Sequence, residues 1–126
     1  MKRLLLLTLA AATAASAGLY DQPYSIITID PAPAADPNLR LVIVNRVDDE
    51  NVLANRAVVA PGPHKVTLDL PPRKGFRLAT QENLDLTTRP CMRYYVAARL
   101  DNATSQRWTP VVRSEERIAE CEKKFK

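Results

Sequence analysis

The sequence is poor in the residue types that most often carry out chemistry. It holds one histidine, two cysteines and three glycines among 126 residues. The glycines stand far apart, at positions 18, 62 and 75, which excludes a glycine-rich phosphate-binding loop. A hydrolase would need His64 to meet a nucleophile, yet neither Ser25 nor Ser114 lies in a GxSxG motif. We therefore predict a protein that is not an enzyme, unless folding brings a serine and a carboxylate such as Asp69 to His64.

The spacing of the metal-binding residue types also argues against a metal centre. The two cysteines are roughly 30 residues apart and the histidine is distant from both, which is not the ligand spacing of a zinc site. The sequence has no CxxC motif for redox exchange. Asp48, Asp49 and Glu50 are adjacent, whereas calcium loops place their carboxylates at alternate positions. We interpret this acidic run as a solvated turn and predict no cofactor.

The positive charge is too small and too dispersed for a nucleic-acid-binding protein. The formal net charge is +4, and Lys2 and Arg3 supply two of these charges. The remaining arginines are spread along the chain, and the densest basic run, EKKFK at the C-terminus, is short. A nucleic-acid interface needs basic residues gathered on one surface, so we predict no nucleic-acid partner.

The first 17 residues have the pattern of a secretory signal peptide. Two basic residues precede an apolar run over 4–14, and the triplet Ala-Ser-Ala at 15–17 resembles the motif after which signal peptidase cleaves. The run is shorter than the about 20 residues needed to cross about 30 Å of hydrocarbon. We predict a signal peptide at 1–17 and one domain at 18–126, without a transmembrane segment in the mature chain. The expected location is periplasmic or secreted.

Cys91 and Cys121 both lie in the predicted mature domain. An exported protein folds where disulfides persist, and an even number of cysteines favours pairing. A bridge between them would close a loop of about 31 residues, which stabilises a fold by about 3–4 kcal/mol in the chain-entropy model. Cys91 directly precedes the strongest strand pattern of the chain. We therefore predict a structural disulfide that fixes the C-terminal tail to the base of this strand.

Short alternating segments separated by prolines and polar turns predict an all-β sandwich of about seven short strands. We expect residues 39–47 to form one inner strand and residues 55–70 to form a hairpin around Pro61 and Gly62. A short C-terminal helical tail is expected within 114–125. The segments from which the strands are drawn are 24–29, 39–47, 55–60, 64–70, 76–80, 83–88, 92–100 and 107–113.

Residues 39–72 resemble a PEGA-type module. The shared landmarks are the two strands at 39–47 and 56–59, the Pro61-Gly62 turn and a strand that begins at His64. The turn reads PGPH, and the aromatic residue expected near the strand end is missing. The resemblance covers about a quarter of the chain. It implies an immunoglobulin-like or transthyretin-like β-fold in a non-catalytic part of a cell-envelope protein. The chain is also similar to small proteins exported by Gram-negative bacteria.

The outward side of the strand at 92–100 is the one candidate binding face. Arginines beside aromatic residues are enriched where proteins bind partners, and here Arg93, Tyr95 and Arg99 share one side of the strand. Arg107 and Trp108 are expected across the hairpin. The alternative is a solvated sheet face on which arginine stems pack over aromatic rings. An envelope protein, a lipid head group or an anionic glycan would fit this face.

We expect a non-enzymatic binding or accessory module of the cell envelope. The alternative is a secreted inhibitor or a subunit of an envelope protein complex.

Overall fold

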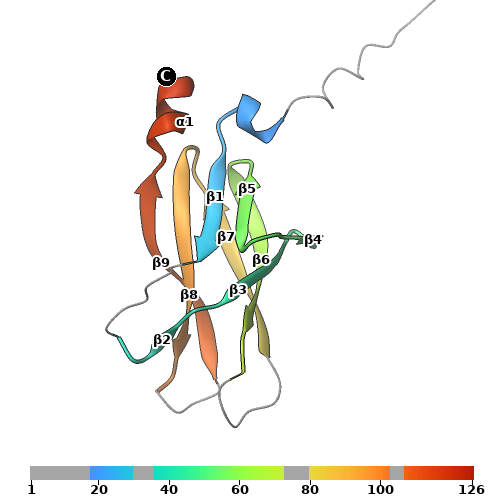
Figure 1. Ribbon diagram of the computed structural model, residues 1–126, viewed down its shortest axis with the longest axis vertical. Helices are drawn as coiled ribbons and strands as arrows, with labels where there is room; N and C mark the ends of the chain where they lie inside the picture. Colours follow the sequence, from blue (N-terminus) through green and yellow to red (C-terminus); the bar gives the residue numbers. More distant parts are fainter. Residues whose placement is uncertain (1–17, 30–35, 73–79, 103–106) are drawn as a thin grey trace, which may run out of the picture.

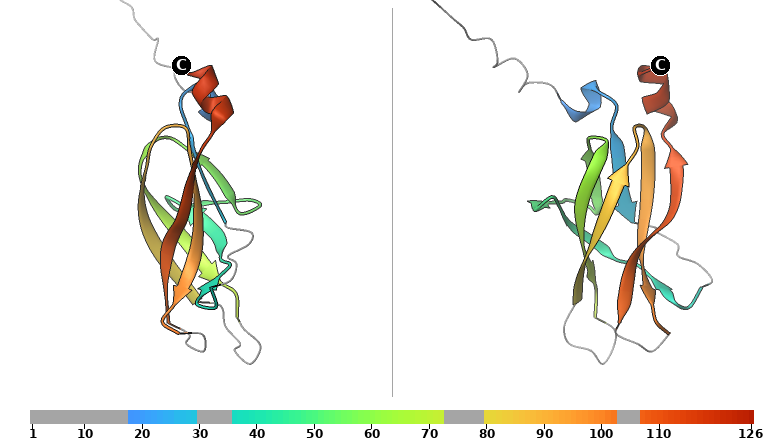
Figure 2. Two further views of the ribbon diagram at one scale, coloured as in Figure 1. Left: turned by 90° about the vertical axis from the view of Figure 1, so that its left-hand side faces the viewer. Right: turned by 180° about the vertical axis from the view of Figure 1, so that it is seen from behind.

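Nine strands in two sheets and one short α-helix make up most of the residues that this computed structural model describes, namely 18–29, 36–72, 80–102 and 107–126 (Figures 1 and 2). The predicted all-β sandwich is confirmed. The predicted signal peptide at 1–17 lies outside the described residues. Within them, no helix has the length and apolar character needed to span a membrane.

In chain order the elements are η2 (Leu19–Asp21), β1 (Ser25–Ile29), β2 (Leu39–Arg40), β3 (Ile43–Val47), β4 (Glu50–Asn51), β5 (Arg56–Val59), β6 (Gly62–Leu70), β7 (Thr80–Thr88), β8 (Met92–Leu100), β9 (Trp108–Arg117) and α1 (Ala119–Lys124).

Sheet A is built around β8, the strand that the sequence predicts most clearly. β9 pairs antiparallel with β8 along its whole length, and β1 pairs parallel with the other edge of β8. β2 pairs antiparallel with the end of β8 beyond β1, and β5 follows β1 as the outermost strand. β9 is an edge strand, as Pro110 indicated. The bulge in the β8–β9 pairing lies at Arg113, because Tyr95 pairs with Ser114 whereas Val96 pairs with Val112.

Sheet B has the strand order β4-β3-β6-β7, and the chain enters it twice from sheet A. The predicted single strand at 39–47 is wrong, because β2 belongs to sheet A and β3 to sheet B. Leu39 is buried from sheet A and Val44 from sheet B, and Val42 is buried from the connection between them. The bend between the sheets explains why apolar residues occupy both parities of this segment, a pattern that we had interpreted as one inner strand.

The predicted hairpin at 55–70 is also wrong. β5 pairs with β1 in sheet A, whereas β6 pairs with β3 and β7 in sheet B. Pro61 has no amide hydrogen to continue the ladder, so the chain leaves sheet A there. Gly62 follows with a φ of 132°, a backbone conformation that glycine adopts without a steric penalty. The proline turn therefore carries the chain from one sheet to the other.

The segments after this turn are longer than the sequence suggested. Residues 80–88 form one nine-residue strand, β7, which runs through the Gln81-Glu82 pair that we expected to divide two strands. Residues 76–79 lie outside the described part of the chain. The predicted C-terminal helical tail is confirmed, but it is limited to α1 because β9 continues to Arg117.

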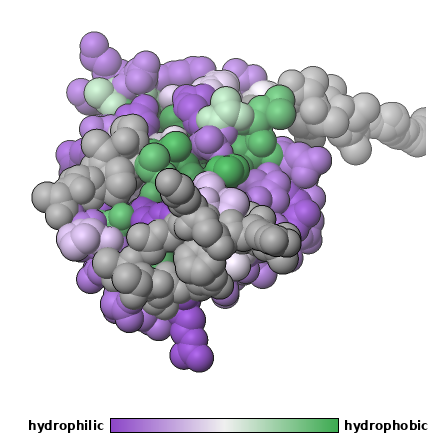
Figure 3. All heavy atoms as spheres, turned by 60° about the horizontal axis from the view of Figure 1, so that its bottom comes forward, coloured by the Kyte–Doolittle hydropathy of each residue, from purple (hydrophilic) through white to green (hydrophobic). Residues whose placement is uncertain are grey.

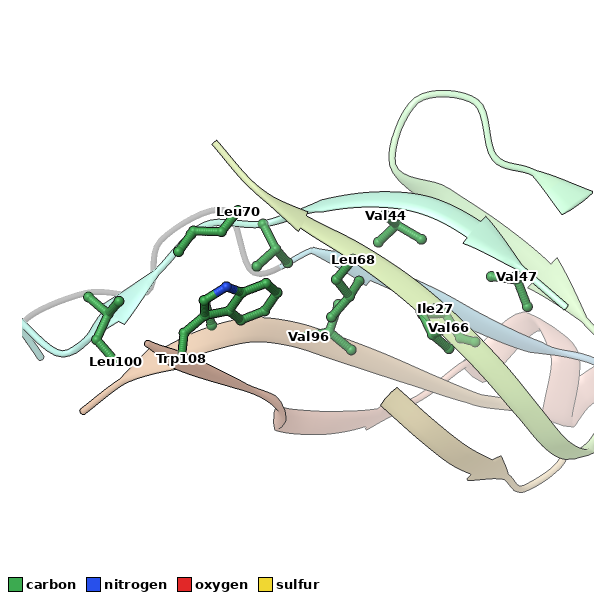
Figure 4. Close-up of a cluster of buried hydrophobic side chains, with 11 residues drawn as sticks. Ile27, Val44, Val47, Val66, Leu68, Leu70, Val96, Leu100 and Trp108 are labelled. Carbon is green, nitrogen blue, oxygen red and sulfur yellow. The ribbon is translucent and has the colours of Figure 1, made fainter. Parts of the chain in front are cut away.

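Side chains from both sheets meet in the main hydrophobic core, shown in Figure 4. The inward side of β8 supplies Val96, Ala98 and Leu100, as its alternation predicted. Trp108 of β9 is opposite Leu100 in the ladder and points inward with it. The remaining buried members of this core are Ile27, Val42, Val44, Val47, Val66, Leu68 and Leu70.

A second hydrophobic cluster surrounds the predicted disulfide, which is confirmed. Cys91 and Cys121 are joined with an S–S distance of 2.00 Å and a Cα–Cα distance of 5.3 Å. Tyr24, Ile26 and Ile118 are buried around the bridge, and Ile118 donates a backbone hydrogen bond to the Cys91 carbonyl at 3.0 Å. A six-residue helix is too short to be stable alone, so the bridge and this cluster hold α1 to the sandwich.

Candidate functional site

Arg93, Tyr95 and Arg99 lie on the outward side of β8, where the sequence placed them, and we call these three residues the outer β8 face. Their neighbours Tyr94, Val96 and Leu100 are buried on the opposite side. Trp108, which we had placed near this face, does not belong to it. The residue is 7% exposed and belongs to the main core, and Nε1 donates a hydrogen bond to Thr80 Oγ1 at 2.7 Å.

Glu116 of β9 connects Arg93 with Tyr95. It lies directly opposite Arg93 in the antiparallel ladder, where side chains project to the same side of the sheet. Arg93 Nη1 is 2.6 Å from Glu116 Oε1, and the Tyr95 hydroxyl donates to the same oxygen at 3.0 Å. Three side chains from two paired strands therefore form one hydrogen-bonded cluster. Because Arg93 is only 25% exposed, its guanidinium is held rather than free in solvent.

The electrostatics of this cluster follow from its hydrogen bonds. The bond from Arg93, followed by the bond from Tyr95, lowers the pKa of Glu116. Partial burial, together with the adjacent Glu116 carboxylate, raises the pKa of Tyr95. Partial burial by itself lowers the pKa of Arg93, but Glu116 and Tyr95 outweigh it and the pKa is raised. The cluster is thus a charged pair with a neutral phenol at neutral pH.

The other two predicted residues lie apart from this cluster. Arg99 is six residues further along β8, which at about 3.3 Å per residue places it roughly 20 Å from Arg93. Its Nη1 is 3.7 Å from Asp36 Oδ2, and its side chain is about half exposed. Arg107 precedes β9 and, with Thr80, Glu82 and Asp101, lines a surface hollow of about 400 Å³ beside Trp108. The four predicted residues therefore do not form one continuous site.

His64 is part of a structural contact that the sequence did not reveal. Its Nδ1 lies 2.6 Å from Asp48 Oδ2 and its Nε2 lies 2.6 Å from the Ala60 carbonyl oxygen. Asp48 Oδ1 also accepts the Lys65 amide at 2.9 Å. The hydrogen bond from His64, then that from Lys65, lowers the pKa of Asp48. The ring therefore connects the β3–β4 turn to the end of β5.

The serines and the carboxylate considered as catalytic partners of His64 lie elsewhere. Ser25 is buried with its hydroxyl 3.5 Å from the Val59 carbonyl, and Ser114 is exposed on β9. Asp69 accepts hydrogen bonds from Asn45 at 3.0 Å and from Gln81 at 2.8 Å. The described residues also contain no group of three or more metal-binding side chains.

The acidic run at 48–50 forms the predicted polar turn. Asp48 and Asp49 both have positive φ angles, 52° and 68°, between the paired residues Val47 and Glu50. Two-residue hairpin loops of this kind need positive φ at both positions, which aspartate tolerates better than most residues.

A groove beside β5 is a feature that sequence reasoning missed. It has a volume of about 320 Å³ and opens along the edge of the sandwich beside β4. Leu53, at 84% exposure, is by far the most exposed of the large hydrophobic residues in the described ranges. The groove-lining residues are Val47, Asp48, Glu50, Asn51, Val52, Leu53, Arg56, Ala57, Val58 and Val59, and we call this the β5 groove.

The surface elsewhere mixes polar and apolar residues. On the face in Figure 3, which brings the lower end of Figure 1 forward, hydrophobic atoms gather near the middle and hydrophilic atoms surround them.

Comparison with known proteins finds no matching family model, no matching curated protein and no matching solved structure. The PEGA-type resemblance therefore remains a prediction.

Proposed function

We propose that the protein is a non-enzymatic binding or accessory module of the cell envelope that works in the periplasm. The disulfide supports this proposal, because such bridges persist in oxidising compartments and are rare in the cytosol. The signal-peptide pattern of residues 1–17 and the PEGA-type resemblance point to the same compartment.

The observation that carries the binding role is the Arg93–Tyr95–Glu116 cluster on sheet A. Binding is strengthened when the residues that contact a partner are already held in place, because less side-chain entropy is lost on association. Here two paired strands and two hydrogen bonds to one carboxylate oxygen position an arginine and a tyrosine. Tyrosine and arginine are also the residues that most often dominate binding energy at protein interfaces.

The charge of the cluster favours a protein partner over an anionic glycan. Glu116 already neutralises Arg93. A polyanion would have to displace this carboxylate, whereas a protein surface can add hydrogen bonds to the pair as it stands. The envelope protein is therefore the favoured partner class.

The proposal is tested with Arg93→Ser/Arg99→Ser and the control Arg117→Ser. Arg117 is opposite Met92 in the ladder, so its side chain lies on the other side of the sheet from the outer β8 face. Its Nε is 3.7 Å from Glu122 Oε2. Immobilised wild type and both variants are incubated with periplasmic extract, and retained proteins and acidic glycans are quantified. We expect one protein to be retained by wild type and Arg117→Ser but lost with the double variant. Equal retention by all three, at equal melting temperature, would refute the role of this face.

A further inference from the structure

β5 is an edge strand whose second edge is open. It pairs with β1 on one side, and no other described strand pairs with it. Open edges carry unpaired backbone groups that can join another strand, and natural proteins usually protect them with charges, prolines or bulges. β5 contains no proline and carries one charge, Arg56 at its start, so the edge along Ala57, Val58 and Val59 has neither form of protection. Figure 1 shows β4 reaching outward on this side of the molecule. Residues of both strands line the β5 groove.

The two ends of the β5 groove carry opposite charge. Arg56 begins β5, whereas Val59 and Ala60 at its other end lie beside Asp48, because His64 contacts both Asp48 and Ala60. Glu50 begins β4 directly after this turn and also lines the groove. Within the described ranges, neither Arg56 nor Glu50 has an ion pair. The groove thus presents one unpaired cation and one unpaired anion at opposite ends of an open strand edge.

We propose that β5 pairs antiparallel with β5 of a second copy of this chain, forming a two-fold symmetric dimer. In such a pair, Arg56 of each copy lies opposite Val59 of the other and therefore beside the other copy's Glu50. The set of charges complements itself only in this reversed orientation. Two-fold symmetry then makes both contacts identical, as in the commonest class of homodimer.

Leu53 adds an apolar contact to this interface. It stands on the β4–β5 connection at the rim of the groove, where a neighbouring β5 would cover it. Pairing would satisfy the open backbone edge, remove Leu53 from water and pair two charges in each copy. An extended peptide from another protein would use the backbone edge as well, but it would not be expected to match both charges.

The dimer would arrange the rest of the molecule in a specific way. Partner residues in an antiparallel ladder project to the same side, so the two-fold axis is perpendicular to sheet A. The outer β8 faces of both copies would therefore point in one direction. This inference stands apart from the proposed function, although a bivalent surface would strengthen binding to a clustered partner.

A charge-swap experiment tests the pairing. The oligomeric state of wild type, Arg56→Glu, Glu50→Arg and the double variant Glu50→Arg/Arg56→Glu is measured by sedimentation equilibrium over a range of concentrations. Each single variant places like charges together twice per dimer, so dimer dissociation constants should rise at least about tenfold. The double variant restores both pairs and should return to the wild-type value. Arg117→Glu, on β9, serves as the control and should dimerise like wild type.

Each other outcome overturns the inference. A monomeric wild type at all concentrations would show that β5 does not pair with itself, including the case in which the groove takes only a partner peptide. If Arg56→Glu leaves the dimer dissociation constant unchanged, the dimer forms through another surface. Single variants that weaken the dimer without rescue by the double variant would exclude the antiparallel arrangement. Melting temperatures separate these results from misfolding, and binding by the outer β8 face is measured independently.

Discussion

β8 and β9 pair over nine registered positions from Met92 to Leu100, whereas β5 pairs with β1 over four. At the β8–β9 end, a disulfide and a buried cluster attach α1 to the sheet. At the β4–β5 side, Val52, Ala57 and Val59 are only partly buried against the main core, and single polar side chains help to hold the chain. Asn55 Oδ1 accepts the Val44 amide at 3.1 Å, and its carbonyl accepts the Thr28 hydroxyl at 3.3 Å.

The difference shows how one small domain can attach its C-terminal tail through a disulfide and a buried cluster and leave a strand edge open elsewhere. The disulfide-bonded side, formed by β8, β9 and α1, presents a fixed set of side chains on β8. This arrangement does not depend on the β5 edge. The open side, formed by β4 and β5, keeps one unpaired strand edge, an exposed leucine and an unpaired charge at each end. The following predictions ask whether stability is distributed in the same way.

The disulfide should show the largest effect. Replacing both cysteines in Cys91→Ala/Cys121→Ala releases a loop of about 31 residues in the unfolded chain, and we expect unfolding to become easier by about 3–4 kcal/mol. Urea denaturation of the oxidised wild type and the variant measures this difference. A midpoint unchanged by the double substitution would show that the buried cluster alone attaches the tail.

One apolar truncation on each side should sharpen the contrast. Ile118 is 1% exposed beside the disulfide, so Ile118→Ala should cost about 2–4 kcal/mol through lost burial and a cavity. Leu53 is 84% exposed, so Leu53→Ala should change monomer stability by less than about 0.5 kcal/mol. Both are measured at low protein concentration to avoid any contribution from association. Equal losses would contradict the comparison.

Asn55 should matter more than its position in a short connection between strands suggests. It has a φ of 56°, which asparagine tolerates, and it joins β3 and β1 through two hydrogen bonds. Asn55→Ala should therefore cost about 1–2 kcal/mol through loss of the bond to Val44 and added backbone strain. Ala54, with a φ of 59°, provides the matched case, because Ala54→Gly should leave the fold intact or slightly more stable. A neutral Asn55→Ala variant would mean that these bonds do not hold the open side.

The disulfide-bonded side was also the more predictable of the two from the sequence. Met92–Leu100 alternates because β8 is central in sheet A, with one side toward the core and the other carrying the polar residues, although Ala97 on that second side is buried as well. Cys91 stands at the start of this strand. The short segment at 39–47 was misread because alternation does not reveal when a chain changes sheets. Sequence likewise places Pro61 at a break without showing whether the next strand joins the same sheet.

The candidate sites show the same limit. Arg93, Tyr95 and Arg99 follow from strand parity, but Glu116 joins them only through the β8–β9 register, which a bulge shifts at Arg113. Trp108 was misplaced because its parity relative to β8 depends on that register. The open edge of β5 follows from the order of strands in sheet A, and no local pattern encodes that order.

Acid titration should give the smallest effect and should report on the open side. The hydrogen bonds from His64 and Lys65 lower the pKa of Asp48, so the stabilisation they provide is fully present above the unfolded aspartate pKa of about 3.9. It is lost as the pH falls through the lower folded pKa. Asp48 is half exposed, so the change in stability should stay below about 1 kcal/mol.

The Lys65 amide proton, which points at Asp48 Oδ1, is the probe for this titration by NMR. Its chemical shift should titrate with a midpoint below about 3.9 in wild type. His64→Gln removes the largest cause of the shift and should move the midpoint upward, while the Ile118 amide beside the disulfide should not follow Asp48. If the midpoint is the same in both proteins, His64 does not hold the turn.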